Sequence, residues 1–128
     1  MKIDFVNTWK ASKQPRKQRK YRYNAPLHIL SKFVSVNLAK ELRAKYKKRN
    51  IETRKGDKIK VMRGQHKGKT GKVESVSLKD SLVYVAGVES IRKDGTKNLI
   101  ALQPSNLQIT ELDTTDKKRF TKSASKKE

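Results

Sequence analysis

Glycines alternate with cationic residues along positions 61–73, which read Val-Met-Arg-Gly-Gln-His-Lys-Gly-Lys-Thr-Gly-Lys-Val. Glycine permits positive φ and a close approach of the backbone to a partner, and cations and backbone N–H groups bind phosphate oxygens. We therefore predict a bent loop between two strands that grips phosphates; a hairpin turn with merely solvated lysines is the alternative. The candidate contact residues are Arg63, Gly64, His66, Lys67, Gly68, Lys69, Gly71 and Lys72. Valine at position 68 or 71 is then expected to weaken binding more than it lowers the melting temperature.

A second group of cations fills residues 10–23, which contain no acidic side chain. Like charges repel and little apolar surface is available, so we expect this arm to lack a compact structure by itself. Against a nucleic acid, each neutralised phosphate would release counterions, and tyrosine rings could stack on unpaired bases. The candidate contacts are Lys10, Lys13, Arg16, Lys17, Arg19, Lys20, Tyr21, Arg22 and Tyr23. A solubilising tail or a targeting signal is the alternative interpretation.

A third cluster, Lys47, Lys48 and Arg49, follows a predicted helix. Cations at a helix C-terminus complement the helix dipole whether or not a ligand is present, so nucleic-acid contact and simple dipole stabilisation are both open here. Similar runs in the tail, at 117–119 and 126–127, are weaker candidates for the same role.

Composition indicates what the surface attracts. The 128 residues include 33 Lys and Arg against 12 Asp and Glu, a formal net charge of +21, which favours a polyanionic partner. The chain has no cysteine, which excludes disulfides and thiolate chemistry. No apolar run is long enough to span a bilayer, and the N-terminus lacks the apolar stretch of a secretory signal. We expect a soluble, cytoplasmic protein without membrane contact.

Catalytic residues are not suggested by the sequence. The two histidines, His28 and His66, fall in different predicted elements, and no His, Asp or Glu spacing matches a metal site. No nucleophile, base and orienting group occur together in a pattern that suggests an active site. We expect a protein that is not an enzyme and that uses no cofactor, metal or small-molecule substrate.

The elements that must position these cations follow from apolar spacing. We predict helices over 27–34 and 38–46, the second capped by Ser35 or Asn37. Short strands are predicted at 58–61, 76–78, 82–85, 99–102 and 107–109, with turns at 79–81 and 93–96. Leu, Ile, Val and Phe make up about 29% of residues 27–113 but about 10% of the two ends, which is too little for a core.

This pattern predicts a mainly β fold: a small antiparallel barrel preceded by one or two short helices, with basic extensions at both ends. We divide the chain into an N-terminal extension (1–26), a helical segment that packs on the barrel (27–55), the barrel (56–113) and a charged tail (114–128).

Residues 56–64, Gly-Asp-Lys-Ile-Lys-Val-Met-Arg-Gly, and 67–73, Lys-Gly-Lys-Thr-Gly-Lys-Val, resemble the KOW motif of ribosomal proteins and transcription elongation factors. Upstream, residues 12–20 and 25–28, and the segment from 38 to 50, resemble one family in particular. It is the universal large-subunit ribosomal protein twenty-four, in its archaeal and eukaryotic form, and the resemblance covers about residues 10–115.

That resemblance implies an SH3-like barrel that binds large-subunit ribosomal RNA beside neighbouring ribosomal proteins. It also implies early binding in subunit assembly and a place near the nascent-chain exit. By position, residues 63–72 and 13–22 would contact the RNA, by shape and phosphate contacts with a steep dependence on salt. The alternative is a KOW module of the transcription elongation type that docks on polymerase.

Overall fold

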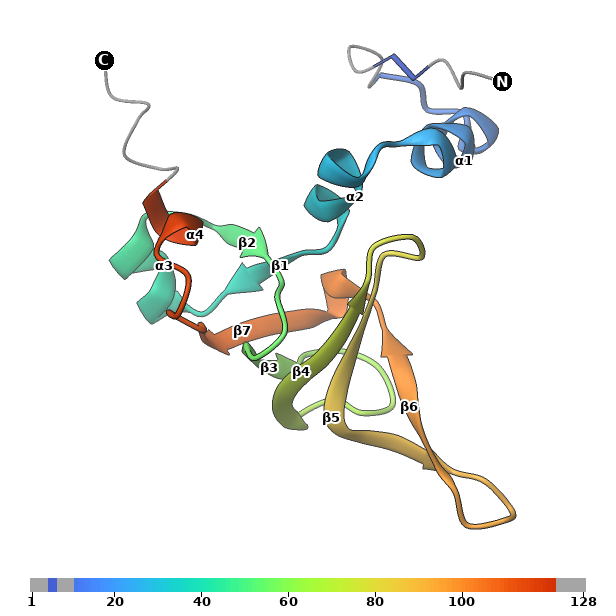
Figure 1. Ribbon diagram of the computed structural model, residues 1–128, viewed down its shortest axis with the longest axis vertical. Coiled ribbons are helices and arrows are strands. Elements are labelled where there is room, and N and C mark those ends of the chain that lie inside the picture. Colours follow the sequence, from blue (N-terminus) through green and yellow to red (C-terminus); the bar gives the residue numbers. More distant parts are fainter. Residues whose placement is uncertain (1–4, 7–10, 122–128) are drawn as a thin grey trace.

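The computed structural model describes residues 5–6 and 11–121, and its main body is a strongly curved sheet (Figure 1). Within the described residues, seven strands are hydrogen-bonded in the order β2-β1-β7-β3-β4-β5-β6. They are β1 (Ser35–Leu38), β2 (Asn50–Glu52), β3 (Lys58–Val61), β4 (Thr70–Ser77), β5 (Leu82–Ile91), β6 (Lys97–Leu102) and β7 (Leu107–Glu111).

Alternating side chains place the core on the concave face of this sheet. Strand β3 reads Lys-Ile-Lys-Val, and its two apolar residues, Ile59 and Val61, are fully buried. Register shifts in β4 and β5 mark bulges, which bend strands and increase their twist. The buried valines, leucines and isoleucines of β1, β2, β3, β4, β5 and β7 form one cluster. The expected fold class, a mainly β SH3-like barrel with a few short helices, is confirmed.

The expectation of a wholly antiparallel barrel needs one correction. Strands β1 and β7 pair in parallel, with Asn37 opposite Gln108 and Leu38 opposite Ile109. A parallel pair needs a long connection, and here the connection is most of the barrel itself.

The segment before the second helix was also predicted wrongly. Leu38 belongs to β1, where Val36 and Leu38 point into the core, and the helix α3 begins only at Lys40 (Lys40–Tyr46). Neither Ser35 nor Asn37 caps it; Ala39 occupies that position without a side-chain hydrogen bond. The N–H groups of Leu38 and Ala39 instead donate to Arg49 and Ile109 carbonyls, so sheet pairing outweighs helix capping at this site.

The N-terminal arm contains a helix that the sequence did not predict. Helix α1 (Pro15–Asn24) is followed by α2 (Leu27–Phe33), and the two form a second cluster with Ala25, Ile29 and Leu30 at its centre. Phe5, Tyr21, Phe33 and Leu78 pack against it. Because Leu78 lies at the β4–β5 turn, this cluster joins the helices to one end of the barrel (Figure 1). Leu27, the first residue of α2, is 69% exposed and takes no part in this cluster.

The predicted turns at 79–81 and 93–96 are confirmed. In the second one, the Asp94 carboxylate accepts hydrogen bonds from the N–H and hydroxyl of Thr96. A short 3-10 turn, η1 (Pro104–Asn106), precedes β7.

Packing does not end at residue 113, where we expected a charged tail to begin. Helix α4 (Lys118–Thr121) docks on the barrel, with Arg119 only 7% exposed. The Phe120 ring stacks on Tyr46 of α3 with centroids 4.9 Å apart. Residues 122–128, including the 126–127 cluster, lie outside the described part of the chain.

Candidate nucleic-acid interface

The loop between β3 and β4, residues 62–69, is closed at its base by two hydrogen bonds. Val61 N–H donates to the Lys69 carbonyl, and Gly68 N–H donates to the Val61 carbonyl, both at 2.8 Å. Inside the loop, Lys67 N–H donates to Gly64 and Lys69 N–H donates to His66. The loop is therefore closed and internally hydrogen-bonded, and the predicted bent loop between two strands is confirmed.

This geometry divides the loop's N–H groups into two sets. Those of residues 67–69 are used within the loop, so the expectation that they are available to phosphate was wrong. Within the described residues, no protein group accepts from the N–H groups of residues 63–66. Gly64 has φ +97° and Gly68 has φ +89°, each with open space where a Cβ would stand. These two glycines permit the bend and leave the backbone accessible.

The cations of the loop point into solvent. Arg63, Lys67 and Lys69 are exposed, and none of them pairs with a carboxylate in the described part of the chain. His66 is half-buried. Exposed cations beside accessible N–H groups form an anion-binding surface, and nothing in the loop resembles catalytic geometry.

Gly71 has a different role from the one expected. It lies in β4, and a Cβ built on it would stand 2.2 Å from the Ala86 carbonyl oxygen and 2.9 Å from a methyl group of Val85. Gly71 therefore allows β4 and β5 to approach, and it serves the fold rather than a ligand. Lys72 beside it is exposed on the same strand.

Helix α1 presents a second basic surface. Its cations are all exposed, no acidic residue lies in its first turn, and Lys13 precedes it in an exposed position. The helical cations are Arg16, Lys17, Arg19, Lys20 and Arg22. Lys10 lies outside the described residues.

The two tyrosines of α1, predicted as equivalent base-stacking residues, lie in opposite environments. Tyr23 is 83% exposed and available to a partner. Tyr21 is half-buried, with its ring centroid 5.0 Å from that of Phe5 and 6.2 Å from that of Phe33. Tyr21 thus fastens α1 to α2 and is not free to stack on a base.

The third cluster follows α3. Lys47 adopts a left-handed conformation with φ +52° and ends the helix, after which Lys48 is half-buried and Arg49 exposed. The structure brings Arg54, Lys118 and Arg119 into this neighbourhood. Sequence reasoning missed Arg54 and treated the 117–119 run as a separate, weaker candidate. No local pattern could have revealed this grouping, because its cations come from the turn before β2, the loop after β2 and the C-terminal segment.

Carboxylates near this cluster are held in their charged form. A hydrogen bond from the Arg54 side chain, followed by one from the Lys118 N–H, lowers the pKa of Asp116 below its ordinary value of 3.8. The Thr115 N–H does the same for the pKa of Asp113. Both carboxylates lie within the segment that leads into α4.

The three basic surfaces are separate. Figure 1 shows α1 beyond the β4–β5 turn, the 62–69 loop beside β3 and β4, and α3 with β2 and α4 on the opposite side. Among residues 5–6 and 11–121, no three His, Asp or Glu side chains gather as a metal site. No helix in those ranges combines the length and apolar character needed to cross a membrane.

Comparison with known proteins gives a consistent result. A family model that describes the ribosomal proteins L26 of eukaryotes and their L24 counterparts of archaea matches residues 12–126. The large ribosomal subunit protein uL24 of Methanothrix thermoacetophila is 52% identical over 108 residues, which cover 84% of this chain and 93% of that protein. The protein of the same name from Methanosarcina barkeri is 49% identical over the same shares of the two chains.

Proposed function

The chain belongs to the family of eukaryotic L26 and archaeal L24 ribosomal proteins, and we propose that it is a structural constituent of the large ribosomal subunit that binds ribosomal RNA. The observation that carries this proposal is the 62–69 loop. Three exposed cations without carboxylate partners stand there beside four N–H groups that no described protein group engages.

Recognition would depend on phosphates and shape rather than on base edges. Lysine, arginine and backbone N–H groups contact phosphate oxygens without reading sequence, and helical RNA offers side chains little access to its bases. The basic surfaces lie on different sides of the molecule, so a partner that contacts all of them has to surround it. Folded ribosomal RNA can surround a protein in this way. A partner that docks on a single flat face would contact only one of the basic surfaces.

Family membership supports a position in the cytoplasmic large subunit, beside other ribosomal proteins, and a structural rather than an enzymatic role. From the family resemblance, we also propose early binding during subunit assembly and a location near the nascent-chain exit. Order-of-addition reconstitution tests the first part: subunits assembled with the protein added last should form more slowly than those given it at the start.

The RNA proposal is tested by the salt dependence of binding to protein-free large-subunit ribosomal RNA. Each phosphate contact contributes about 0.7–0.9 to the slope of log affinity against log salt. Alanine at Arg63, Lys67 and Lys69 together should therefore reduce the slope by about 2–3. Alanine at Lys79, Lys93 and Lys97 changes the net charge equally and is the matched control. An equal loss in both variants would show that only net charge matters.

The polymerase-docking alternative makes a different prediction. A ribosomal constituent co-sediments with large subunits after a moderate salt wash, at a fixed stoichiometry. A transcription module would be found with polymerase instead, and its absence from washed subunits would contradict the ribosomal proposal.

A further inference from the structure

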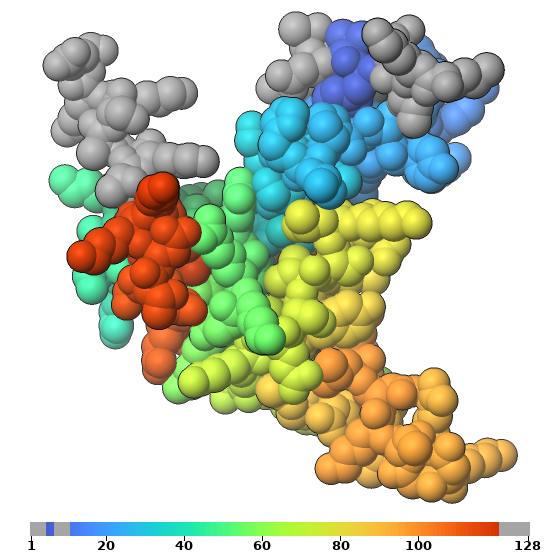
Figure 2. All heavy atoms as spheres, viewed as in Figure 1, coloured from blue at the N-terminus to red at the C-terminus, as the bar shows by residue number. Residues whose placement is uncertain are grey.

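A basic groove lies where β2 meets the C-terminal segment; we call it the β2 groove. Its volume is about 650 Å³, and five cations line it: Lys48, Arg49, Arg54, Lys118 and Arg119. Figure 2 shows the C-terminal segment, in red, lying against the green surface to which β2 belongs. Two carboxylates, Glu52 and Asp116, also line the groove, so the lining carries an excess of three positive charges.

The internal ion pairs show which of these charges are available. Arg119 is neutralised by the buried Asp57, and its second amino group also donates to the Glu52 carbonyl. Arg54 pairs with Asp116 at 2.5 Å, with both side chains close to half exposed. Lys48 and Arg49 pair with no carboxylate in the described part of the chain. An incoming anion would therefore meet Lys48 and Arg49 first.

We propose that the β2 groove seats the sugar-phosphate backbone of an RNA strand. This proposal rests on the function proposed above and names a contact site separate from the 62–69 loop. Lys48 and Arg49 would bind successive phosphates, and Arg54, which contacts Asp116 through Nη1, keeps other guanidinium N–H groups that can donate to a phosphate oxygen. Ser35 and Asn50 also line the groove and supply neutral polar groups that can meet ribose hydroxyls.

The size and charge of the groove favour a strand over a single small anion. Its volume falls in the range of sites that enclose whole ligands rather than single ions. Further exposed cations adjoin the lining residues in the chain: Lys47 precedes Lys48, and Lys117 precedes Lys118. An acidic protein segment would match the same charge, and the experiment separates it from RNA.

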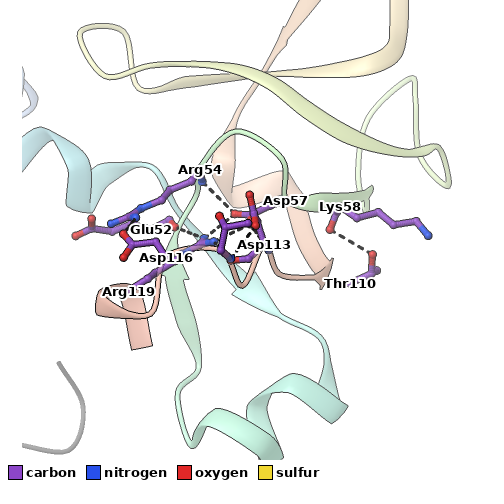
Figure 3. Close-up of polar contacts among 9 residues, drawn as sticks. Glu52, Arg54, Asp57, Lys58, Thr110, Asp113, Asp116 and Arg119 are labelled. Carbon is purple, nitrogen blue, oxygen red and sulfur yellow. Dashed lines mark hydrogen bonds and ion pairs between the residues drawn. The ribbon is translucent and has the colours of Figure 1, made fainter. Parts of the chain in front are cut away.

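The C-terminal segment forms one wall of this groove. The Arg119–Asp57 ion pair (Figure 3), together with the Arg54–Asp116 pair and the Phe120–Tyr46 stack, holds the segment against the barrel and brings Asp116, Lys118 and Arg119 to the groove. The buried ion pair thus also positions one wall of a surface groove that can bind a ligand.

The test compares full-length variants bound to protein-free large-subunit ribosomal RNA. Lys48→Ala with Arg49→Ala should reduce the salt slope by about 1.5–2, the value for two lost phosphate contacts. Lys48→Arg with Arg49→Lys keeps both charges and should keep the slope. Lys93→Ala with Lys97→Ala, in the β5–β6 hairpin, removes the same charge elsewhere and should leave it nearly unchanged. Unchanged melting temperatures would verify that the variants are folded.

Each outcome has a distinct meaning. If the groove variant binds RNA like the unmodified protein while the triple loop variant loses affinity, the groove proposal is wrong and RNA binding by the loop stands. If neither variant changes binding, both proposals fail. If the groove variant binds RNA normally but is not incorporated into subunits, an acidic protein occupies the groove and the RNA assignment is overturned.

Discussion

Arg119 and Asp57, 62 positions apart in the chain, form a doubly hydrogen-bonded ion pair inside the molecule (Figure 3). Nη1 of Arg119 donates to Oδ1 of Asp57 at 2.7 Å, and Nη2 donates to Oδ2 at 2.6 Å. The same carboxylate accepts from the N–H groups of Arg54 and Asp113, each at 3.0 Å. One aspartate therefore fixes the turn before β3, the end of β7 and the C-terminal helix.

Removing one partner of this pair should be strongly destabilising. Arg119→Met leaves the Asp57 carboxylate buried without its cation, and losing one member of a buried pair costs about 3–5 kcal/mol. Urea denaturation measures the free energy of unfolding. Lys117→Met, at an exposed position two residues away, should change it by no more than about 0.5 kcal/mol. Similar losses in the two variants would mean that Arg119 contributes no more than a surface charge.

Two glycines of the basic stretch should respond differently to alanine. At Gly71 the new Cβ would overlap the Ala86 carbonyl, so β4 and β5 must separate, at a cost of about 3 kcal/mol or more. At Gly68 the Cβ enters open space, and only its positive φ is penalised, by about 1–2 kcal/mol. Thermal unfolding ranks the two. A larger loss at Gly68 would contradict the assignment of Gly71 to strand packing.

Substitution of Tyr21 should lower the stability of α1, whereas substitution of Tyr23 should affect only RNA binding. Tyr21→Ala removes two ring contacts, worth about 0.5–1.5 kcal/mol each, and should speed hydrogen exchange in the α1 amides. Tyr23→Ala should leave exchange unchanged. If Tyr23 stacks on a base, its loss costs about 1–3 kcal/mol of RNA affinity. An exchange increase for Tyr23→Ala that matches the one for Tyr21→Ala would refute the distinction.

Acid should weaken the C-terminal docking through Asp116. Because the folded pKa of Asp116 lies below its ordinary value of 3.8, its ionised form stabilises the fold above that value. This stabilisation is lost as the pH falls from 3.8 through the lowered pKa. The melting temperatures of the unmodified protein and of Asp116→Asn should therefore converge in acid. Thermal unfolding of both proteins from neutral to acidic pH measures this, and melting temperatures that stay equally far apart at every pH would contradict the role of Asp116.

Local patterns predicted much of this molecule. Alternating apolar residues identified β3 and the later strands, because burial on one face of a strand imposes a period of two. Spacing of glycines and cations located the 62–69 loop, since the bend and the charge are properties of adjacent residues. Charge density alone indicated a polyanionic partner, because the net charge of a surface does not depend on how the chain folds.

The sequence did not reveal the roles of residues whose environment is set by residues far away in the chain. Whether Gly71 serves a ligand or the fold is decided by Ala86 on the next strand, and Tyr21 differs from Tyr23 only through Phe5 and Phe33. Arg119 looks like one more residue of a lysine-rich tail until Asp57 is placed beside it. Composition and local periodicity thus determined the class and the charge of this protein, whereas tertiary contacts decided which residues are free to bind, because burial depends on residues far apart in the chain.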